Sequence, residues 1–146
     1  MNNISDFLTP DHHRCDSIFA DAESAAASGE WDKATIAFNQ FVDALRHHFA
    51  MEEEVLFPAF DDRTGMAMGP TATMRMEHRQ MTDLISQMTD AVQQHDKNGF
   101  LGLSETLLMI MQQHNMKEEQ MLYRMADQVL GDESDSIVDD MKKTAA

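Results

Sequence analysis

Apolar residues recur every three or four positions through most of the chain, and short stretches rich in glycine, proline or polar residues interrupt this pattern. Such a period matches one face of an amphipathic α-helix. No segment sustains the alternation of apolar and polar residues that a half-buried strand requires, so we expect no sheet. The pattern predicts helices over residues 9–28, 31–58, 70–98 and 100–131.

Local signals predict where these helices begin and end. Thr9-Pro10-Asp11 is typical of a helix start, because it combines a hydroxyl cap, a proline at the first helical position and an acid in the first turn. Pro58 is expected to end or kink the second helix, since proline has no backbone N–H to donate. Residues 61–69 are expected to form the longest loop, and Asn98-Gly99 to stop the third helix.

The connections between the predicted helices are short, which favours antiparallel packing of neighbours. We therefore predict an all-α fold, an up-down-up-down antiparallel four-helix bundle in one domain that spans residues 1–146. The bundle itself is expected at about residues 9–131. The tail, residues 132–146, is polar but contains the apolar pair Ile137-Val138, which allows one short C-terminal helix.

Histidine and glutamate interrupt the apolar inward faces of all four predicted helices. In two places a histidine precedes a glutamate by four residues, at His48 and Glu52 and again at His114 and Glu118. On a helix this spacing stacks the imidazole and the carboxylate on one face. The same phase places Met121 and Met125 inward on the last helix. Tyr123, nine residues after His114, is expected to face away from the histidines.

The two His-x3-Glu copies lie 66 residues apart, and this offset selects the other histidines. His12 has His78 as its partner at the same offset, whereas the adjacent His13 has Arg79. In each half the second histidine follows the first by 36 positions, so the sequence resembles two copies of a helix pair. One symmetric set results, and its members are His12, His48, Glu52, His78, His114 and Glu118.

This set predicts a metal centre in the bundle core. Ionised glutamates are costly to bury without a partner, and a metal ion supplies the compensating charge. A mixed nitrogen and oxygen environment suits iron and also accepts manganese or zinc, whereas a soft thiolate site is excluded. A single His-x3-Glu pair is ordinarily a solvated ion pair, so the duplication carries the argument. A structural zinc site or a metal-free bundle is the simpler alternative.

The remaining polar residues near these positions have more ordinary interpretations. His13, His47 and His95 have no repeat partner and are expected at the surface. Asp16, one turn after His12, is a candidate acceptor for an imidazole N–H. The single Cys15 is expected to be a small core residue. Glu53, Glu54 and Glu119 are expected to form a solvated face.

Composition narrows the classes of partner. The formal net charge is −15, from 26 acidic and 11 basic residues, which argues against nucleic-acid phosphates and against an anionic membrane surface. No apolar run approaches the roughly 20 residues that span a bilayer, and the first residues lack the pattern of a secretory leader. One cysteine permits no disulfide within the chain. These features favour a cytoplasmic location.

The order His, His-x3-Glu, His, His-x3-Glu resembles the hemerythrin-like (HHE cation-binding) family over about residues 5–130. The resemblance implies two iron ions in an oxo- or hydroxo-bridged di-iron centre. By this resemblance, His12 and His48 hold one iron and His78 and His114 hold the other, while Glu52 and Glu118 bridge the two.

The chain departs from the oxygen-carrying hemerythrins at two points. Those proteins have a second histidine one turn away on the third helix, where this chain has Met74 and Thr82, and a His-x4-Asp pair on the last helix. The ligand set resembles that of bacterial hemerythrin-like proteins instead, and it implies an open position on both irons. We therefore expect binding of, or reaction with, O2, peroxide or nitric oxide. Iron storage, sensing or delivery, and reversible O2 carriage, are the alternatives, and the sequence does not decide whether the protein is an enzyme.

Overall fold

The computed structural model describes residues 3–66 and 68–144, which are mostly helical and contain no strand. None of the helices in these ranges is both long and apolar enough to cross a membrane. The predicted all-α class is confirmed. The elements are α1 (Ile4–Ala27), α2 (Trp31–Met51), the π-helix η1 (Glu52–Leu56), α3 (Phe57–Thr64), α4 (Pro70–Gln93), α5 (Lys97–Lys117), the π-helix η2 (Glu118–Leu122), α6 (Tyr123–Val129), the 3-10 helix η3 (Gly131–Glu133) and α7 (Ser134–Lys142).

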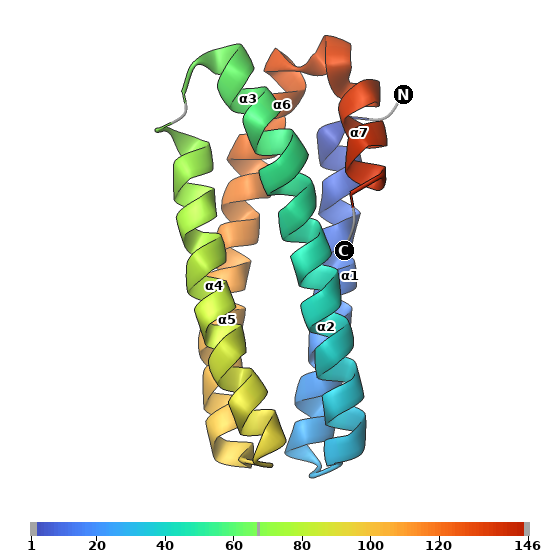
Figure 1. Cartoon of the computed structure of the whole chain (residues 1–146), viewed down its shortest axis with the longest axis vertical. Coiled ribbons are helices and arrows are strands. Elements are labelled where there is room, and N and C mark those ends of the chain that lie inside the picture. Colours follow the sequence, from blue (N-terminus) through green and yellow to red (C-terminus); the bar gives the residue numbers. More distant parts are fainter. Residues whose placement is uncertain (1–2, 67, 145–146) are drawn as a thin grey trace.

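Four long rods lie side by side and alternate in direction, as predicted for an up-down-up-down bundle (Figure 1). The first and third rods are α1 and α4. The second rod runs continuously from α2 through η1 into α3, and the fourth runs from α5 through η2 into α6. The short C-terminal helix is also present as α7, which buries Ile137, Val138 and Met141 against α1 and η1.

The first helix begins earlier than the sequence predicted. It starts at Ile4 rather than at Thr9, and Pro10 lies inside it. The side chain of Asn3 caps this end by accepting a hydrogen bond from the backbone N–H of Asp6 at 2.6 Å, and the carboxylate of Asp127 accepts from the N–H of Ile4 at 2.8 Å. These two acceptors stabilise turns that precede the proline, so Pro10 no longer marks the start.

The second helix does not end at Pro58, and the predicted loop is shorter. The chain continues through α3 to Thr64, and Gly65 ends the helix with φ of 70°, the left-handed conformation that glycine adopts readily. Asp61, predicted to open the loop, instead lies in α3 and accepts hydrogen bonds from Thr71 and Arg75 of α4. The helix survives Pro58 because the π turn immediately before it already rearranges the local hydrogen bonds.

The connection between the third and fourth rods also lies earlier in the chain than the sequence predicted. It lies at residues 94–96, where His95 has a positive φ of 53°, and Asn98-Gly99 falls inside the first turn of α5. The carboxylate of Asp96 accepts a hydrogen bond from the N–H of Gly99 at 3.0 Å. This cap makes Asp96 the start of α5, so Gly99 lies within the first turn of α5 and does not end α4. The exposed His95 ring stacks on Trp31, with 5.1 Å between ring centroids.

Two apolar clusters fill the bundle, and a layer of polar side chains separates them. The larger cluster contains Phe19, Phe38 and Cys15, and burial raises the pKa of the Cys15 thiol to about 11. The second cluster lies at the end of the bundle that α3, α6 and α7 close. Along each rod the histidines and glutamates fall between residues of one cluster and residues of the other, so the polar layer crosses the whole bundle.

Truncating a side chain of the larger cluster tests this packing. Phe38→Ala should lower the free energy of unfolding by about 3–5 kcal/mol, because it removes a buried aromatic ring and leaves a cavity. Ile36→Ala on the same helix is the matched control, since Ile36 is 61% exposed, and it should change stability by less than about 0.5 kcal/mol. Chemical denaturation followed by circular dichroism measures both. Equal losses would contradict the described core.

Candidate metal centre

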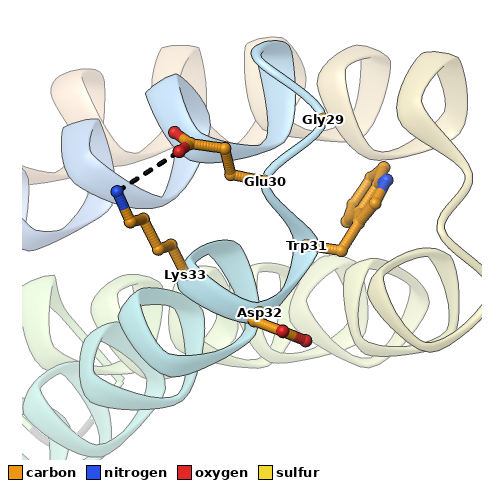
Figure 2. Close-up of a pocket in the computed structure, with 5 residues that line it drawn as sticks. All are labelled: Gly29, Glu30, Trp31, Asp32 and Lys33. Carbon is orange, nitrogen blue, oxygen red and sulfur yellow. Dashed lines mark ion pairs between the residues drawn. The ribbon is translucent and has the colours of Figure 1, made fainter.

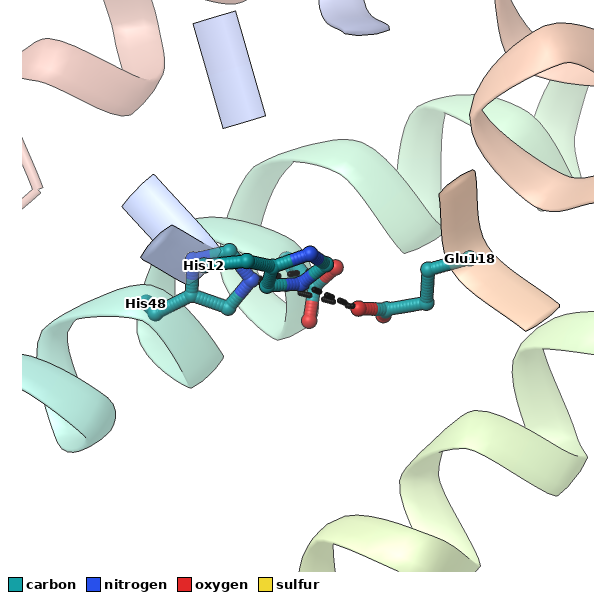
Figure 3. Close-up of side chains that lie close together, drawn as sticks. His12, His48 and Glu118 are labelled. Atoms are coloured by element: carbon teal, nitrogen blue, oxygen red, sulfur yellow. Dashed lines mark hydrogen bonds and ion pairs between the residues drawn. The ribbon is translucent and has the colours of Figure 1, made fainter. Parts of the chain in front are cut away.

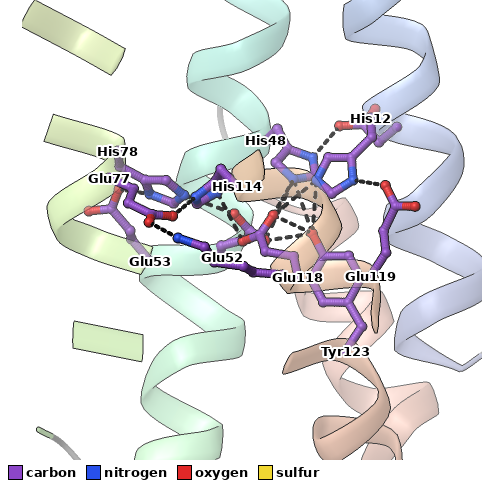
Figure 4. A network of polar contacts seen from close by, with 12 residues as sticks. His12, His48, Glu52, Glu53, Glu77, His78, His114, Glu118, Glu119 and Tyr123 are labelled. Carbon is purple, nitrogen blue, oxygen red and sulfur yellow. Dashed lines mark hydrogen bonds and ion pairs between the residues drawn. The ribbon is translucent and has the colours of Figure 1, made fainter. Parts of the chain in front are cut away.

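The structure brings the six residues selected by the repeat into one buried cluster (Figure 4). None of them is more than 3% exposed. Each rod contributes at least one residue, and the two that carry a π-helix contribute a histidine and a glutamate each. The cluster consists of His12, His48, Glu52, His78, His114 and Glu118.

The cluster divides into two groups that share both glutamates. In each group the potential donor atoms lie within 4.8 Å of one another. His12, His48, Glu52 and Glu118 make up one group, and Glu52, His78, His114 and Glu118 make up the other. Figure 3 shows His12, His48 and Glu118 of the first group side by side. Each of these adjacent groups has enough donor atoms to hold a metal ion, and the two groups share both carboxylates.

Each glutamate directs one oxygen toward each histidine pair. Glu52 places Oε2 at 3.6 Å from Nε2 of His48 and Oε1 at 3.1 Å from Nε2 of His78. Glu118 places Oε1 at 3.0 Å from Nε2 of His12 and Oε2 at 3.3 Å from Nε2 of His114. The two carboxylates therefore lie between the histidine pairs, and every imidazole presents Nε2 to the centre.

A carboxylate outside the cluster holds the other nitrogen of every imidazole. Since an ionised carboxylate only accepts hydrogen bonds, each Nδ1–H donates, which leaves Nε2 free to bind a metal. The repeat relates these acceptors too, because Asp11 and Glu77 are 66 residues apart, as are Glu53 and Glu119. The four pairs are His48 with Asp11 at 2.8 Å, His114 with Glu77 at 2.8 Å, His12 with Glu119 at 2.7 Å and His78 with Glu53 at 2.7 Å.

Electrostatics favours positive charge at the centre of the cluster. Burial lowers the pKa of His78, but the adjacent carboxylates of Glu52 and Glu53 outweigh it and raise the pKa to about 9. Burial raises the pKa of Glu118, but the charge of His114 and hydrogen bonds within the cluster hold it well below its usual range. The glutamates thus attract cations, either protons on the imidazoles or metal ions between them.

Several donor atoms of the cluster lack a hydrogen bond, which tests whether a metal fits. In the described part of the chain, five buried side-chain atoms have no hydrogen-bond partner, and four of them belong to the cluster. These four are Glu52 Oε1, His78 Nε2, His114 Nε2 and Glu118 Oε2. Unsatisfied buried polar atoms are costly, and imidazole nitrogens with carboxylate oxygens form a donor set suited to iron, manganese or zinc. The residues present therefore fit a bound metal.

The two π turns correct the predicted phase of the last helix. In η2 the N–H of Tyr123 donates to the carbonyl of Glu118, and in η1 the N–H of Phe57 donates to that of Glu52. Each wide turn adds one residue, which rotates the following chain by about 100° relative to an unbroken α-helix. Met121, predicted inward, is consequently 60% exposed.

Tyr123, predicted to face away, is instead fully buried with its hydroxyl in the cluster. The hydroxyl donates to Glu52 Oε2 at 2.6 Å and lies 3.0 Å from Glu118 Oε1. Burial and these two carboxylates raise the pKa of the phenol well above its usual value, which keeps it protonated. The π turn that moves Tyr123 inward has no clear sequence signal, because Pro58 after η1 corresponds to Arg124 after η2.

Two acidic residues beside the cluster make contacts that the sequence analysis did not predict. Glu53 and Glu119 were expected to be solvated, but each binds an imidazole while remaining partly exposed, at 43% and 30%. The repeat relates these two residues and could have identified them. Asp16, which the sequence offered as a candidate acceptor, forms no hydrogen bond or ion pair with an imidazole in the ranges that the structure describes. Glu54 is exposed, as expected.

The other histidines lie outside the cluster. His13 is exposed, in agreement with its exclusion by the repeat, and so is His95. His47 was also expected at the surface, but it is half-buried, and its Nε2–H donates to the carbonyl of Thr144 at 3.1 Å.

Surface pockets approach the cluster without reaching it. One pocket is lined by Asp11 and Met51, and another by Glu119 and Asp16, so each contacts an acceptor of a cluster histidine. A third pocket, around Trp31 in the turn between α1 and α2, lies at the end of the bundle away from α3, α6 and α7 (Figure 2). It contains none of the cluster residues. The six cluster side chains are thus shielded from bulk water.

Comparison with known proteins agrees with the geometry of the cluster. The chain is 29% identical over 121 residues to an uncharacterized hemerythrin-like protein of Schizosaccharomyces pombe. The match covers 82% of this chain but 57% of that protein, so the chain spans little more than half the length of this relative. No solved structure matches the chain. The sequence profile of the family described as Hemerythrin HHE cation binding domain matches residues 3–126, and the chain therefore belongs to that family.

Proposed function

We propose that this protein is a non-heme di-iron protein that binds or reacts with O2, peroxide or nitric oxide. In this proposal His12 and His48 hold one iron, His78 and His114 hold the other, and Glu52 and Glu118 bridge the two. The observation that carries the proposal is the orientation of the bridging pair, since each glutamate places one oxygen at each histidine pair. Two buried carboxylates shared in this way are suited to two cations held close together.

When bound, the di-iron centre supplies electrons and an open coordination position for a small ligand. The chain itself orients the ligands and excludes water. Nδ1 hydrogen bonds to carboxylates fix the tautomer and the direction of every cluster imidazole. Glu53 and Glu119 contact both an imidazole and solvent, so they can move protons between the buried centre and the surface.

The residues around His78 support an open position on both irons. Met74 and Thr82, which flank His78 at four residues, supply no further imidazole. Met74 is buried in the apolar cluster at that end of the bundle, and the hydroxyl of Thr82 donates to the backbone carbonyl of His78 at 2.8 Å. Each histidine pair thus has two imidazoles and two carboxylate oxygens. This favours redox chemistry with a small ligand over simple reversible carriage of O2.

The burial of the cluster supports a small substrate. Because the proposed ligands are at most 3% exposed and the neighbouring pockets stop at the outer carboxylates, the site favours a molecule as small as O2, nitric oxide or peroxide over a bulky substrate. Iron storage or delivery remains the alternative proposal, and the exchange of iron distinguishes it.

Iron content together with the absorption spectrum tests the proposed function. The purified, iron-loaded protein should hold about two irons per chain and show charge-transfer absorption that disappears on reduction. Reoxidation by O2 or peroxide, or binding of nitric oxide, should restore or change that absorption while the iron stays bound. Release of the iron during these cycles would favour iron delivery instead. Stable, fully reversible O2 binding without autoxidation would contradict the proposed redox reactivity.

Removing a ligand tests its assignment. His114→Ala and Glu118→Ala should each lose at least one iron per chain, because the donors left behind no longer complete both groups. His13→Ala is the matched control, since His13 is exposed and lies outside both groups, and its iron content should equal that of the wild type. Elemental analysis measures all three. Full iron content in both ligand variants would show that the ligand set is wrong.

Removing an acceptor of an imidazole N–H tests the outer carboxylates. Asp11→Asn and Glu77→Gln should each weaken metal binding by about 10- to 100-fold, because the amide holds the tautomer and the charge of His48 or His114 less firmly. Asp16→Asn serves as control, as it changes the same charge on α1 without touching a cluster imidazole, and its affinity should stay close to wild type. Competition with a metal chelator gives the affinities. Equal effects of Asp11→Asn and Asp16→Asn would mean that only net charge matters.

A further inference from the structure

The two halves of the metal centre differ at a position of the repeat that lies against the cluster histidines. Phe57 and Tyr123 are 66 residues apart, and each follows the π turn of its rod. Their rings occupy matching places, because Phe57 stacks on His78 with 5.7 Å between centroids and Tyr123 stacks on His12 with 5.6 Å. The chief chemical difference at this position is therefore the hydroxyl of Tyr123.

That hydroxyl lies among the donor atoms of the His12 and His48 group. Its proton is donated to Glu52 Oε2 at 2.6 Å, and its oxygen lies 3.0 Å from Glu118 Oε1, 3.2 Å from Nε2 of His12 and 3.3 Å from Nε2 of His48. One protein group thus contacts all four atoms that a metal ion in this half would bind (Figure 4). Metal entry here must break those contacts.

The His78 and His114 group has apolar surroundings instead. The ring of Phe49 stacks on His78 at 3.8 Å and lies 6.4 Å from His114, whereas the repeat places Asn115 at the equivalent position of the other half. All four cluster atoms without a hydrogen bond face this half. The donor atoms of this half pair only with one another, His78 Nε2 with Glu52 Oε1 at 3.1 Å and His114 Nε2 with Glu118 Oε2 at 3.3 Å. A metal ion that binds here replaces these two imidazole–carboxylate contacts, but it has no contact with a phenol hydroxyl to break.

We propose that Tyr123 makes the two metal positions unequal, so that the His78 and His114 position takes up metal before the His12 and His48 position. The inference rests on the proposed two-metal function and adds an order of loading and the residue that sets it. Tyr123 acts as a positioning residue. Its hydroxyl contacts the metal-binding atoms of its half, and a metal ion must compete with the hydroxyl for them.

A titration with Co(II) alone tests the order of loading. Anaerobic titration of the metal-free full-length chain, followed by cobalt absorption and native mass spectrometry, should show two steps. The first should be tighter by about tenfold or more, beyond the statistical difference between two identical positions. His114→Ala should remove the tight step, and His48→Ala the weak one.

Exchanging the hydroxyl between the halves isolates the role of Tyr123. Tyr123→Phe makes the two halves alike at this position and should strengthen the second step by about tenfold, which brings the steps together. Phe57→Tyr is the matched variant, because it puts a hydroxyl beside His78 and should weaken the first step. Circular dichroism checks that both variants fold, and either of them alone tests the proposal.

The outcomes separate this inference from the proposed function. Failure of the wild type to bind two Co(II) ions would overturn both. Two equal steps in the wild type would overturn only the order of loading. A second step that is unchanged or weaker in Tyr123→Phe would also overturn it, because the hydroxyl would then play no part or would itself bind the metal.

Discussion

Two carboxylates that lie fully buried at the middle of the bundle constrain the rest of the structure. Glu52 and Glu118 have no exposed surface, and ionised groups are costly to bury unless opposite charge surrounds them. Four imidazoles provide that environment, and an outer carboxylate at every Nδ1 orients each imidazole toward the pair. Loss of one member would leave another buried group without a partner, so the polar layer that separates the two apolar clusters depends on all of its members.

The π turns adapt the helices to this requirement. Each begins at a cluster glutamate and rotates the next residues inward, so that Phe57 and Tyr123 cover the centre. Wide turns of this kind are rare in helices and frequent at functional sites. Because the rotation is the same in both halves, the phenyl ring of Phe57 and the phenol of Tyr123 occupy matching places, and the two halves of the cluster differ there by one hydroxyl. The repeat thus supplies the symmetry of the site, and Tyr123 breaks it.

The bundle and the six cluster residues could be predicted from the sequence because both depend on regular spacing. The 66-residue offset selected His12 over His13, and the structure places His12 in the cluster and His13 at the surface. The positions of Met121 and Tyr123 could not be predicted, since a single π turn changes the phase of all later residues. The start of α1 was missed because Asp127, far along the chain, accepts from the N–H of Ile4. The part played by iron stays a prediction.

Anomalous diffraction from crystals of the iron-loaded protein, measured at the iron absorption edge, tests the central claim most directly. A di-iron centre should give two iron peaks in the bundle core, with Glu52 and Glu118 between them. One peak should lie next to Nε2 of His12 and His48, and the other next to Nε2 of His78 and His114. A single peak, or peaks only at surface carboxylates such as Asp16, would contradict the proposed two-iron centre.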